Sequence, residues 1–268
     1  MFGLRRRHRE KIRARPFPRE WADALARNVP YYLRLTPEDQ RELRGDIAVF
    51  LDEKNFEGCG GLEMTDEIRV TVAAQACLLL LHRPNDDYPG LRSILVYPHP
   101  YEAPIREAGP GGLAVETVQS RAGESWAQGA VVLAWDAVIG GARDIHDGHN
   151  VVLHEFAHQL DVEDDRPDGV PVLAQTSMYV PWARILGGEY RELVERVTRD
   201  QPTDIDPYGA TDPAEFFAVV TEAFFERPRE LQARHRALYE ELRQFYRQDP
   251  ARRIGDAGEP SPPPAAPP

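Results

Sequence analysis

The sequence predicts an α+β fold that is mostly helical, with a small sheet ahead of a helix that carries a metal-binding motif. Helix start signals precede long stretches of helical apolar spacing in the first and last thirds of the chain. Between them, short β-branched or apolar runs are separated by breakers rich in Pro and Gly, which predict a sheet of about three strands. No internal repeat interrupts this order.

The first third is expected to be helical. Thr36 is an N-capping residue, Pro37 occupies the first helical position, and apolar residues then recur at helical spacing up to residue 51. A second start signal at Thr65 leads into residues 66–78. These are apolar nearly all round, which predicts a buried central helix.

The middle of the chain is expected to form the sheet, and helices return after it. The expected strands are 94–97, 113–117 and 130–135. The expected later helices are 150–160, 183–199, 213–225 and 229–246. Segment 130–135 allows two interpretations, an exposed edge strand beside which an extended peptide binds or a plain core strand.

The two ends of the chain differ in composition from the rest. Residues 1–15 are rich in arginine and are expected to form a basic, solvated tail, with weak contact to an anionic membrane surface or RNA as the alternative. Residues 254–268 are rich in Pro and Ala and are expected to be disordered. The folded domain is therefore expected at 16–253, with a helical part at 16–90 and a catalytic part at 91–253.

Composition excludes several classes of protein. In 268 residues no stretch approaches the roughly 18 apolar residues that cross a bilayer, and the start has no apolar core of a secretory signal. The net charge of −12 argues against direct nucleic-acid binding. Two cysteines, Cys59 and Cys77, cannot build a disulfide framework, so we expect a reducing, cytoplasmic location.

Residues 154–158 carry the chemistry. His154 and His158 are four residues apart, so on a helix both rings lie on one face and can bind one zinc ion. Glu155 lies beside them, where a carboxylate can take a proton from an activated water. This H-E-x-x-H pattern predicts a zinc-dependent hydrolase that cleaves peptide bonds.

A catalytic zinc needs a third protein ligand, and the residues leave three candidates. Asp161 follows His158 by three residues, whereas Glu215 and Glu222 share one face of a later helix. Glu215 also has a structural interpretation, because Asp212, Pro213 and Glu215 form a capping box. Spacing favours Glu215 over the other two without excluding either.

The segment 148–161 resembles the metal-binding helix of the Mlc titration factor A family of zinc peptidases. Other matching segments are 61–67, 73–77, 132–136 and 208–217. The resemblance covers about 17–250 and leaves both end segments outside. It implies a zincin-like metallopeptidase domain with one Zn²⁺ per chain.

In that family, and in the similar catalytic domain of anthrax lethal factor, the third ligand is a glutamate with a tyrosine seven residues before it. Tyr208 and Glu215 have this spacing. The resemblance therefore implies that His154, His158 and Glu215 hold the metal, with Glu155 as general base and Tyr208 as a donor to the oxyanion.

The same resemblance gives the other two carboxylates supporting roles. It implies that Glu222 stabilises the site from outside the ligand set. Asp161 is expected to orient a ligand histidine or the end of the helix.

The resemblance also implies partners. The expected substrate is a peptide or protein, with an aminopeptidase-like or limited specificity. The alternative is a regulatory protein that sequesters a glucose-responsive transcriptional repressor, with peptidase activity secondary. A purely structural zinc site is disfavoured, because such sites have four ligands with cysteine prominent, and both cysteines are remote from the motif.

Overall fold

The structure is a computed structural model that describes residues 2–83, 88–108, 114–121, 123–126, 129–164 and 166–256. Its first elements are α1 (Phe2–Arg13), α2 (Arg19–Asn28), α3 (Pro30–Leu33), α4 (Pro37–Glu53), β1 (Asn55–Gly58) and α5 (Asp66–Leu78). The middle contains β2 (Ser93–Tyr97), β3 (Tyr101–Ala108), β4 (Ala114–Arg121), β5 (Gly123–Trp126), β6 (Ala130–Ala134), α6 (Trp135–Arg143) and α7 (Val151–Asp161). The last elements are η1 (Val162–Asp164), η2 (Thr176–Met178), α8 (Tyr179–Thr198), η3 (Pro207–Ala210), α9 (Pro213–Glu226), α10 (Pro228–Arg234), α11 (Arg236–Tyr246) and α12 (Pro250–Asp256).

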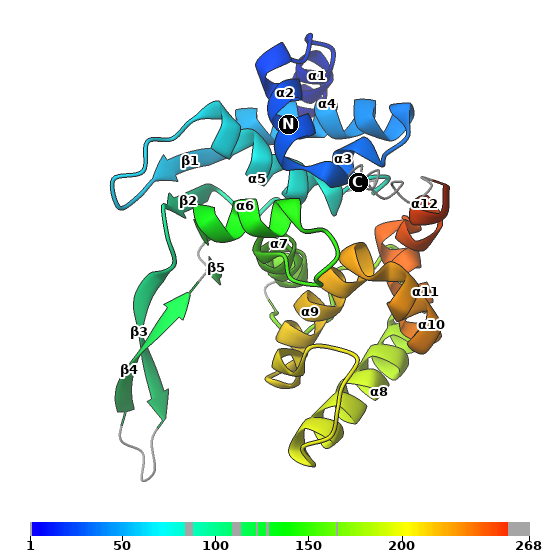
Figure 1. Ribbon diagram of the computed structural model, residues 1–268. Helices are drawn as coiled ribbons and strands as arrows, with labels where there is room; N and C mark the ends of the chain where they lie inside the picture. The colour runs from blue at the N-terminus through cyan, green and yellow to red at the C-terminus, as the bar shows by residue number, and fades with distance from the viewer. Residues whose placement is uncertain are drawn as a thin grey trace, which may run out of the picture.

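The main sheet has the strand order β1-β2-β6-β5. β1, β2 and β6 are parallel, with Phe56 opposite Ile94 and Ile94 opposite Val131, and β5 is antiparallel to β6. The strands β3 and β4 form a separate antiparallel hairpin, which projects away from the sheet in Figure 1. The predicted mostly helical α+β fold with a small sheet is confirmed.

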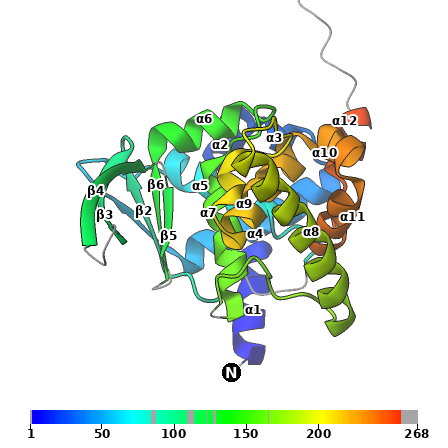
Figure 2. The same ribbon diagram turned by 90° about the horizontal axis from the view of Figure 1, so that it is seen from below.

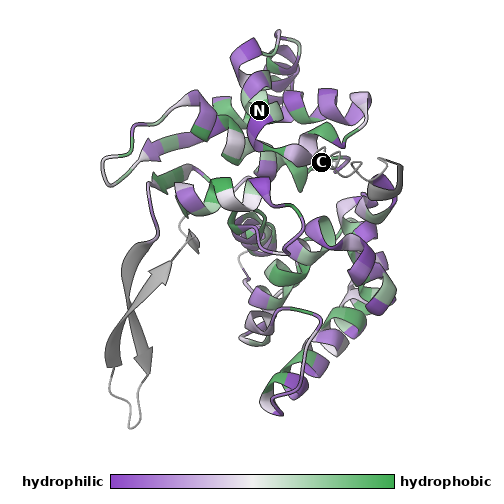
Figure 3. Ribbon diagram, viewed as in Figure 1, coloured by the Kyte–Doolittle hydropathy of each residue, from purple (hydrophilic) through white to green (hydrophobic). Residues whose placement is uncertain are grey.

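The helices form layers on one side of this sheet. Figure 2 shows α7 between the sheet and α9, with α8 beyond α9. α5 is buried along most of its length and packs against both α4 and α7. In Figure 3, hydrophobic residues gather on α9. The metal-motif helix α7 is therefore held inside the core and not at the surface.

The helix start signals have the predicted capping geometry. The Thr36 side chain accepts a hydrogen bond from the Asp39 N–H, and the Thr65 side chain accepts one from the Ile68 N–H. Each bond satisfies a backbone donor that the first helical turn cannot pair internally. Local sequence therefore fixes where α4 and α5 begin.

The sheet differs from the prediction in several details. The expected strands at 94–97 and 130–135 correspond to β2 and β6, but the one at 113–117 falls in the β3–β4 hairpin. Because β6 pairs with β2 on one side and β5 on the other, the edge-strand interpretation of 130–135 is wrong and the core-strand interpretation is confirmed.

The expected helix at 229–246 is divided in two. The break falls at His235, where the backbone leaves the helical region at φ −128° and ψ 54°. The side chain of His235 is held there by Glu189, 2.8 Å from its Nδ1.

The basic N-terminal segment is a helix and not the solvated tail that its charge suggested. Arg9 of α1 makes two hydrogen bonds of 2.7 Å to Glu53 of α4, and Arg13 donates to Asp46 at 2.8 Å. Ile12 is only 2% exposed. Acidic residues of α4 thus neutralise one face of the arginine-rich helix.

At the other end, residues 254–256 complete α12, and the rest of the expected disordered tail, 257–268, lies outside the described residues. Cys59 and Cys77 are not joined by a disulfide. Within the described part of the chain, every helix is too short or too polar to cross a bilayer.

Candidate metal centre

The start of α7 sets the orientation of the motif. Asn150 is the N-capping residue, and its Oδ1 accepts hydrogen bonds from the Val152 and Leu153 N–H groups at 3.1 Å each. Its Nδ2 donates to Gln75 of α5 at 2.9 Å. The cap is therefore fixed both to its own helix and to the core helix beside it.

His154 and His158 face one another across one turn of α7 and meet Glu215 of α9. The two Nε2 atoms are 3.3 Å apart, and Glu215 Oε2 lies 3.0 Å from His154 Nε2 and 3.4 Å from His158 Nε2. Ligand atoms around a tetrahedral zinc with bonds of 2.0–2.1 Å are about 3.3 Å apart. The three side chains therefore fit a divalent ion of this size without rearrangement.

Glu215 lies in the first turn of α9, as the capping pattern predicted, and it also approaches the two histidines. Its backbone N–H donates to Asp212 Oδ1 at 2.9 Å, as an N-cap of α9 requires. Its carboxylate points to the histidines instead of closing the capping box on the Asp212 backbone. Capping thus places Glu215 at the first turn of α9, opposite the motif.

Glu222 lies behind His154. Its Oε1 is 2.8 Å from His154 Nδ1, and its Oε2 accepts a 2.5 Å hydrogen bond from the Asn150 N–H. An acceptor at Nδ1 holds the proton on that nitrogen and leaves Nε2 with a lone pair for the ion. Glu222 thus positions a histidine from outside the His154–His158–Glu215 cluster.

Asp161 is not part of the cluster and makes no hydrogen bond to a ligand histidine in the described residues. It is fully buried, and its Oδ2 accepts from the Gly169 N–H at 3.0 Å. Burial raises the pKa of Asp161 to about 6. Because the Gly169 carbonyl also accepts from Trp182 of α8, Asp161 fixes the loop that follows α7. Among the described residues, the Asp161 carboxylate thus holds the loop after α7, and its expected role in orienting a histidine or the helix end stays a prediction.

Glu155 is buried beside the two histidines. Its residue exposure is 6%, and burial raises its pKa to about 7, against the lowering influence of His154 and His158. A carboxyl group with a pKa near neutrality can both accept and release a proton under physiological conditions.

Gly123 of β5 lies directly against Glu155 and was missed by sequence reasoning. A Cβ at this position would come within 2.6 Å of both Glu155 Oε1 and Val151 Cγ2. Only a glycine therefore allows the edge strand to approach α7 this closely. The available signal was a glycine within a short run, but four residues are too few to predict a strand.

Tyr208 lies at the rim of the centre, in η3. Its ring centroid is 6.0 Å from that of His154, and the residue is 50% exposed. Burial and the neighbouring Glu215 carboxylate raise the pKa of Tyr208 to about 12. The phenol therefore keeps its proton at neutral pH and is available as a hydrogen-bond donor.

The electrostatics of the cluster favour a cation. Burial opposes charge on Glu215, yet hydrogen bonds from His154 and His158 lower its pKa below the usual range. Burial also lowers the pKa of His154, but Glu215 and Glu222 together raise it to about 10. The carboxylates of Glu215 and Glu222 thus converge on the His154 ring. Their negative charge favours a proton on this ring, and a divalent ion can compensate the same charge in place of that proton.

Comparison with known proteins agrees with this geometry. The model of the family described as glucose-regulated metallo-peptidase M90 matches residues 4–247. The match begins near the N-terminus, so it includes the arginine-rich helix that the resemblance was expected to leave outside.

Similar individual proteins cover nearly the whole chain. An uncharacterized protein of Synechocystis is 44% identical over 239 residues, which are 88% of this chain and 86% of that protein. Mlc titration factor A of Klebsiella pneumoniae is 34% identical over 246 residues, 89% of each chain. The protein of the same name from Salmonella gallinarum is 32% identical over 255 residues, 90% of this chain and 92% of that one. The chain belongs to the glucose-regulated metallo-peptidase M90 family.

Proposed function

We propose that this protein is a zinc-dependent peptidase, with His154, His158 and Glu215 as the metal ligands. The convergence of their three ligand atoms at tetrahedral spacing is the observation that supports it best. A divalent ion held there supplies a Lewis acid that polarises a carbonyl group and makes water acidic near neutral pH.

The protein's own residues carry the proton transfers. Glu155 takes a proton from the attacking water and passes it to the leaving amine. Tyr208, protonated at neutral pH, donates a hydrogen bond to the oxygen that gains negative charge. Glu222 keeps the proton of His154 on Nδ1 throughout.

The substitution Glu155→Gln tests this proposal. The variant should keep wild-type zinc content, because Glu155 is not a ligand, and lose peptide hydrolysis by about 10²-fold or more. Glu63→Gln, at an exposed loop position, is the matched control and should remain active. Hydrolysis by Glu155→Gln at the wild-type rate would exclude the general base, and metal-free wild type would exclude the zinc site.

The expected specificity is that of an aminopeptidase-like or limited-specificity enzyme acting in the cytoplasm. Two thiols that are not joined by a disulfide suit a reducing compartment. Chelator-sensitive cleavage of an aminoacyl anilide, compared with the same substrate blocked at its amino group, tests the specificity. Equal cleavage of both would exclude an aminopeptidase.

A second candidate function rests on the relatives named Mlc titration factor A. This chain would then bind an Mlc-like transcriptional repressor and remove it from DNA, with peptidase activity secondary. The Glu155→Gln protein separates the two functions. If it releases a purified repressor of this type from operator DNA, binding is independent of hydrolysis, and if no complex forms, the candidate fails.

A further inference from the structure

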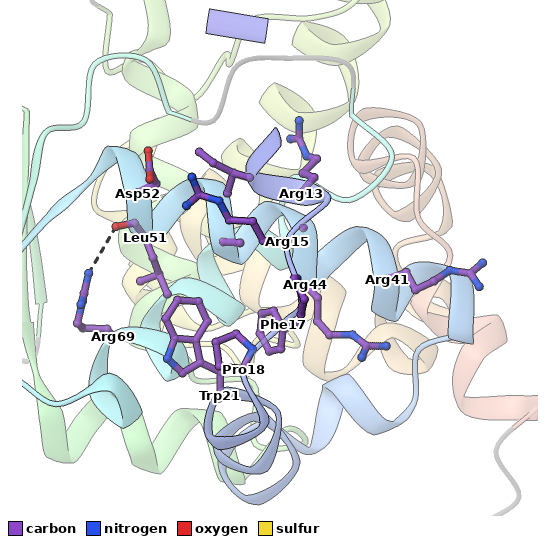
Figure 4. Close-up of a pocket in the computed structure, with 14 residues that line it drawn as sticks. Arg13, Arg15, Phe17, Pro18, Trp21, Arg41, Arg44, Leu51, Asp52 and Arg69 are labelled. Carbon is purple, nitrogen blue, oxygen red and sulfur yellow. Dashed lines mark hydrogen bonds between the residues drawn. The ribbon is translucent and has the colours of Figure 1, made fainter. Parts of the chain in front are cut away.

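A cavity of about 530 Å³ lies at the N-terminal end of the molecule and shares no residue with the metal centre. The arginine side chains that line it point in different directions in Figure 4, so they do not converge on one ligand. A tighter arrangement is found in the loop after α7, at Gly169. This residue is buried, and it touches both of the helices that supply the proposed metal ligands.

Two hydrogen bonds hold the peptide groups of Gly169. Its N–H donates to Oδ2 of Asp161 at 3.0 Å, and Asp161 is the last residue of α7, three residues after His158. Its carbonyl oxygen accepts from Nε1 of Trp182 on α8 at 3.1 Å. Asp161 and Trp182 are both fully buried. Because a buried polar group that loses its partner costs free energy, these bonds define the position of Gly169.

Gly169 also lies against the first turn of α9. A Cβ added to Gly169 would be 2.3 Å from the carbonyl oxygen of Pro213 and 3.2 Å from the Pro213 Cβ. Pro213 is the first residue of α9, two residues before Glu215. Gly169 has φ +76°, a conformation in which a residue with a Cβ is strained. Both the close approach of the two backbones and the backbone conformation therefore require glycine at this position.

The tryptophan that binds Gly169 contacts α9 as well. The Trp182 ring packs edge-on against Phe217, with the ring centroids 5.8 Å apart. Phe217 is fully buried and lies two residues after Glu215 on α9. Trp182 therefore joins the Gly169 carbonyl to the turn of α9 that carries the Glu215 carboxylate.

We infer that Gly169 is a positioning residue that sets the separation between His158 and Glu215. The inference rests on the proposed metal centre, in which both residues are ligands. Asp161 links Gly169 to the end of α7, and Pro213 links it to the start of α9. A side chain at position 169 therefore displaces the start of α9 and moves Glu215 relative to the histidines.

The displacement is larger than a zinc site tolerates. A Cβ contact with backbone below 3.0 Å forces a shift, and the 2.3 Å contact with the Pro213 oxygen is about 0.7 Å short of that limit. Ligand distances around zinc vary by only about 0.2 Å. Because Asp161 and Trp182 hold Gly169 in place, the shift is transmitted to the first turn of α9.

Competition titration of the full-length protein against a chromophoric chelator tests the inference, with zinc as the probe. Gly169→Ala should bind zinc about tenfold or more weakly than wild type. Gly129→Ala is the matched control, because Gly129 has φ +82° and a Cβ there would lie 2.6 Å from the carbonyl oxygen of Gly90. It imposes the same kind of strain in the turn before β6, outside the His154–His158–Glu215 cluster. The control should therefore lose folding stability and keep wild-type zinc affinity.

The geometry of the ligands can be followed without measuring activity. The visible spectrum of the Co²⁺-loaded protein depends on how the ligands are arranged around the ion. This spectrum should change in Gly169→Ala and match that of wild type in Gly129→Ala. A circular dichroism spectrum establishes that both variants are folded.

Two substitutions of Asp161 keep the test decisive if Gly169→Ala does not fold. Asp161→Asn retains a carbonyl oxygen for the Gly169 N–H and should bind zinc like wild type. Asp161→Ala leaves this buried N–H without its acceptor and should weaken zinc binding by about tenfold.

Either of two results would overturn the inference. They are a wild-type zinc affinity for Asp161→Ala, or equal affinities for folded Gly169→Ala and Gly129→Ala. In both cases the direct packing of α7 on α9 would be sufficient to place the ligands. Wild-type protein that binds no zinc would instead refute the proposed metal centre, and the inference with it.

Discussion

Glu222 accepts a hydrogen bond from Nδ1 of His154 at 2.8 Å, while Nε2 of the same ring lies 3.0 Å from Glu215. A carboxylate behind a ligand histidine fixes its tautomer, restricts rotation of the ring and raises its basicity. The two glutamates are seven residues apart on α9, so one helix supplies both a proposed ligand and the group that orients another proposed ligand.

Glu222 is expected to strengthen metal binding because it orients His154. Glu222→Gln should lower zinc affinity by about 10- to 100-fold, because a neutral amide is a weaker acceptor for the ring N–H. Competition titration against a chromophoric chelator measures the effect. Glu63→Gln serves as the control, and a wild-type affinity for Glu222→Gln would show that the contact has no positioning role.

The hydroxyl group of Tyr208 can be removed without removing its ring. Tyr208→Phe should retain zinc and lower kcat by about 10²-fold, since one donor to the developing negative charge is lost. Tyr190→Phe, whose ring packs on Phe216 and which is not among the His154–His158–Glu215 cluster, should leave kcat unchanged. Steady-state kinetics on a peptide substrate would refute the donor role if both variants behave alike.

Contact between β5 and α7 should make Gly123 intolerant of any side chain. Gly123→Ala places a Cβ 2.6 Å from Glu155 Oε1 and should cost about 1–3 kcal/mol in the free energy of unfolding, with reduced kcat. Gly140→Ala on α6 is the matched control. It meets open space and should stabilise the helix by about 0.5–1 kcal/mol. Denaturant unfolding compares the two, and equal stability would contradict the close approach.

The pH dependence of stability should include a contribution from Glu226. This side chain is 2% exposed, and burial raises its pKa to about 9. In the unfolded chain the Glu226 carboxyl loses its proton at its ordinary, lower pKa, whereas in the folded state it keeps the proton up to the raised pKa. Between these two pKa values, the folded state therefore binds more protons than the unfolded state. Stability then falls as pH rises through this window, by on the order of 1 kcal/mol per pH unit.

Glu226→Gln removes this titration. Its unfolding free energy should decline less than that of wild type between pH 6 and pH 9, roughly the upper part of the window. The Gly148 N–H keeps an acceptor in the variant, because glutamine retains one carbonyl oxygen. Parallel pH profiles for the two proteins would show that Glu226 is already ionised in the folded state.

Local sequence was sufficient to predict where a helix begins when neighbouring residues cap its first turn. Thr36, Thr65 and Asp212 each cap the helix that their sequences predict, because the capping bond spans only three residues. The short strands β1 and β5 were not predictable in this way. They have four residues each, and they are strands only because β2 and β6 offer them partners.

The packing of the N-terminal helix α1 was also not predictable from local sequence, in this case from its charge. A run of arginines is ordinarily solvated, but here Glu53 and Asp46 of α4 face α1 and bind three of its arginines. Sequence patterns within residues 1–15 contain no information about acids more than thirty residues away.

For the metal centre, the sequence by itself determined the helical pair His154 and His158 with Glu155 between them, because four-residue spacing places two side chains on one face of any α-helix. The tertiary structure decided where Glu215, Glu222 and Asp161 lie relative to the two histidines. Each has an acceptable chain spacing. Only the packing of α9 across α7 brings one carboxylate to Nε2 and another to Nδ1, while the third, at the end of α7, binds the backbone of the following loop.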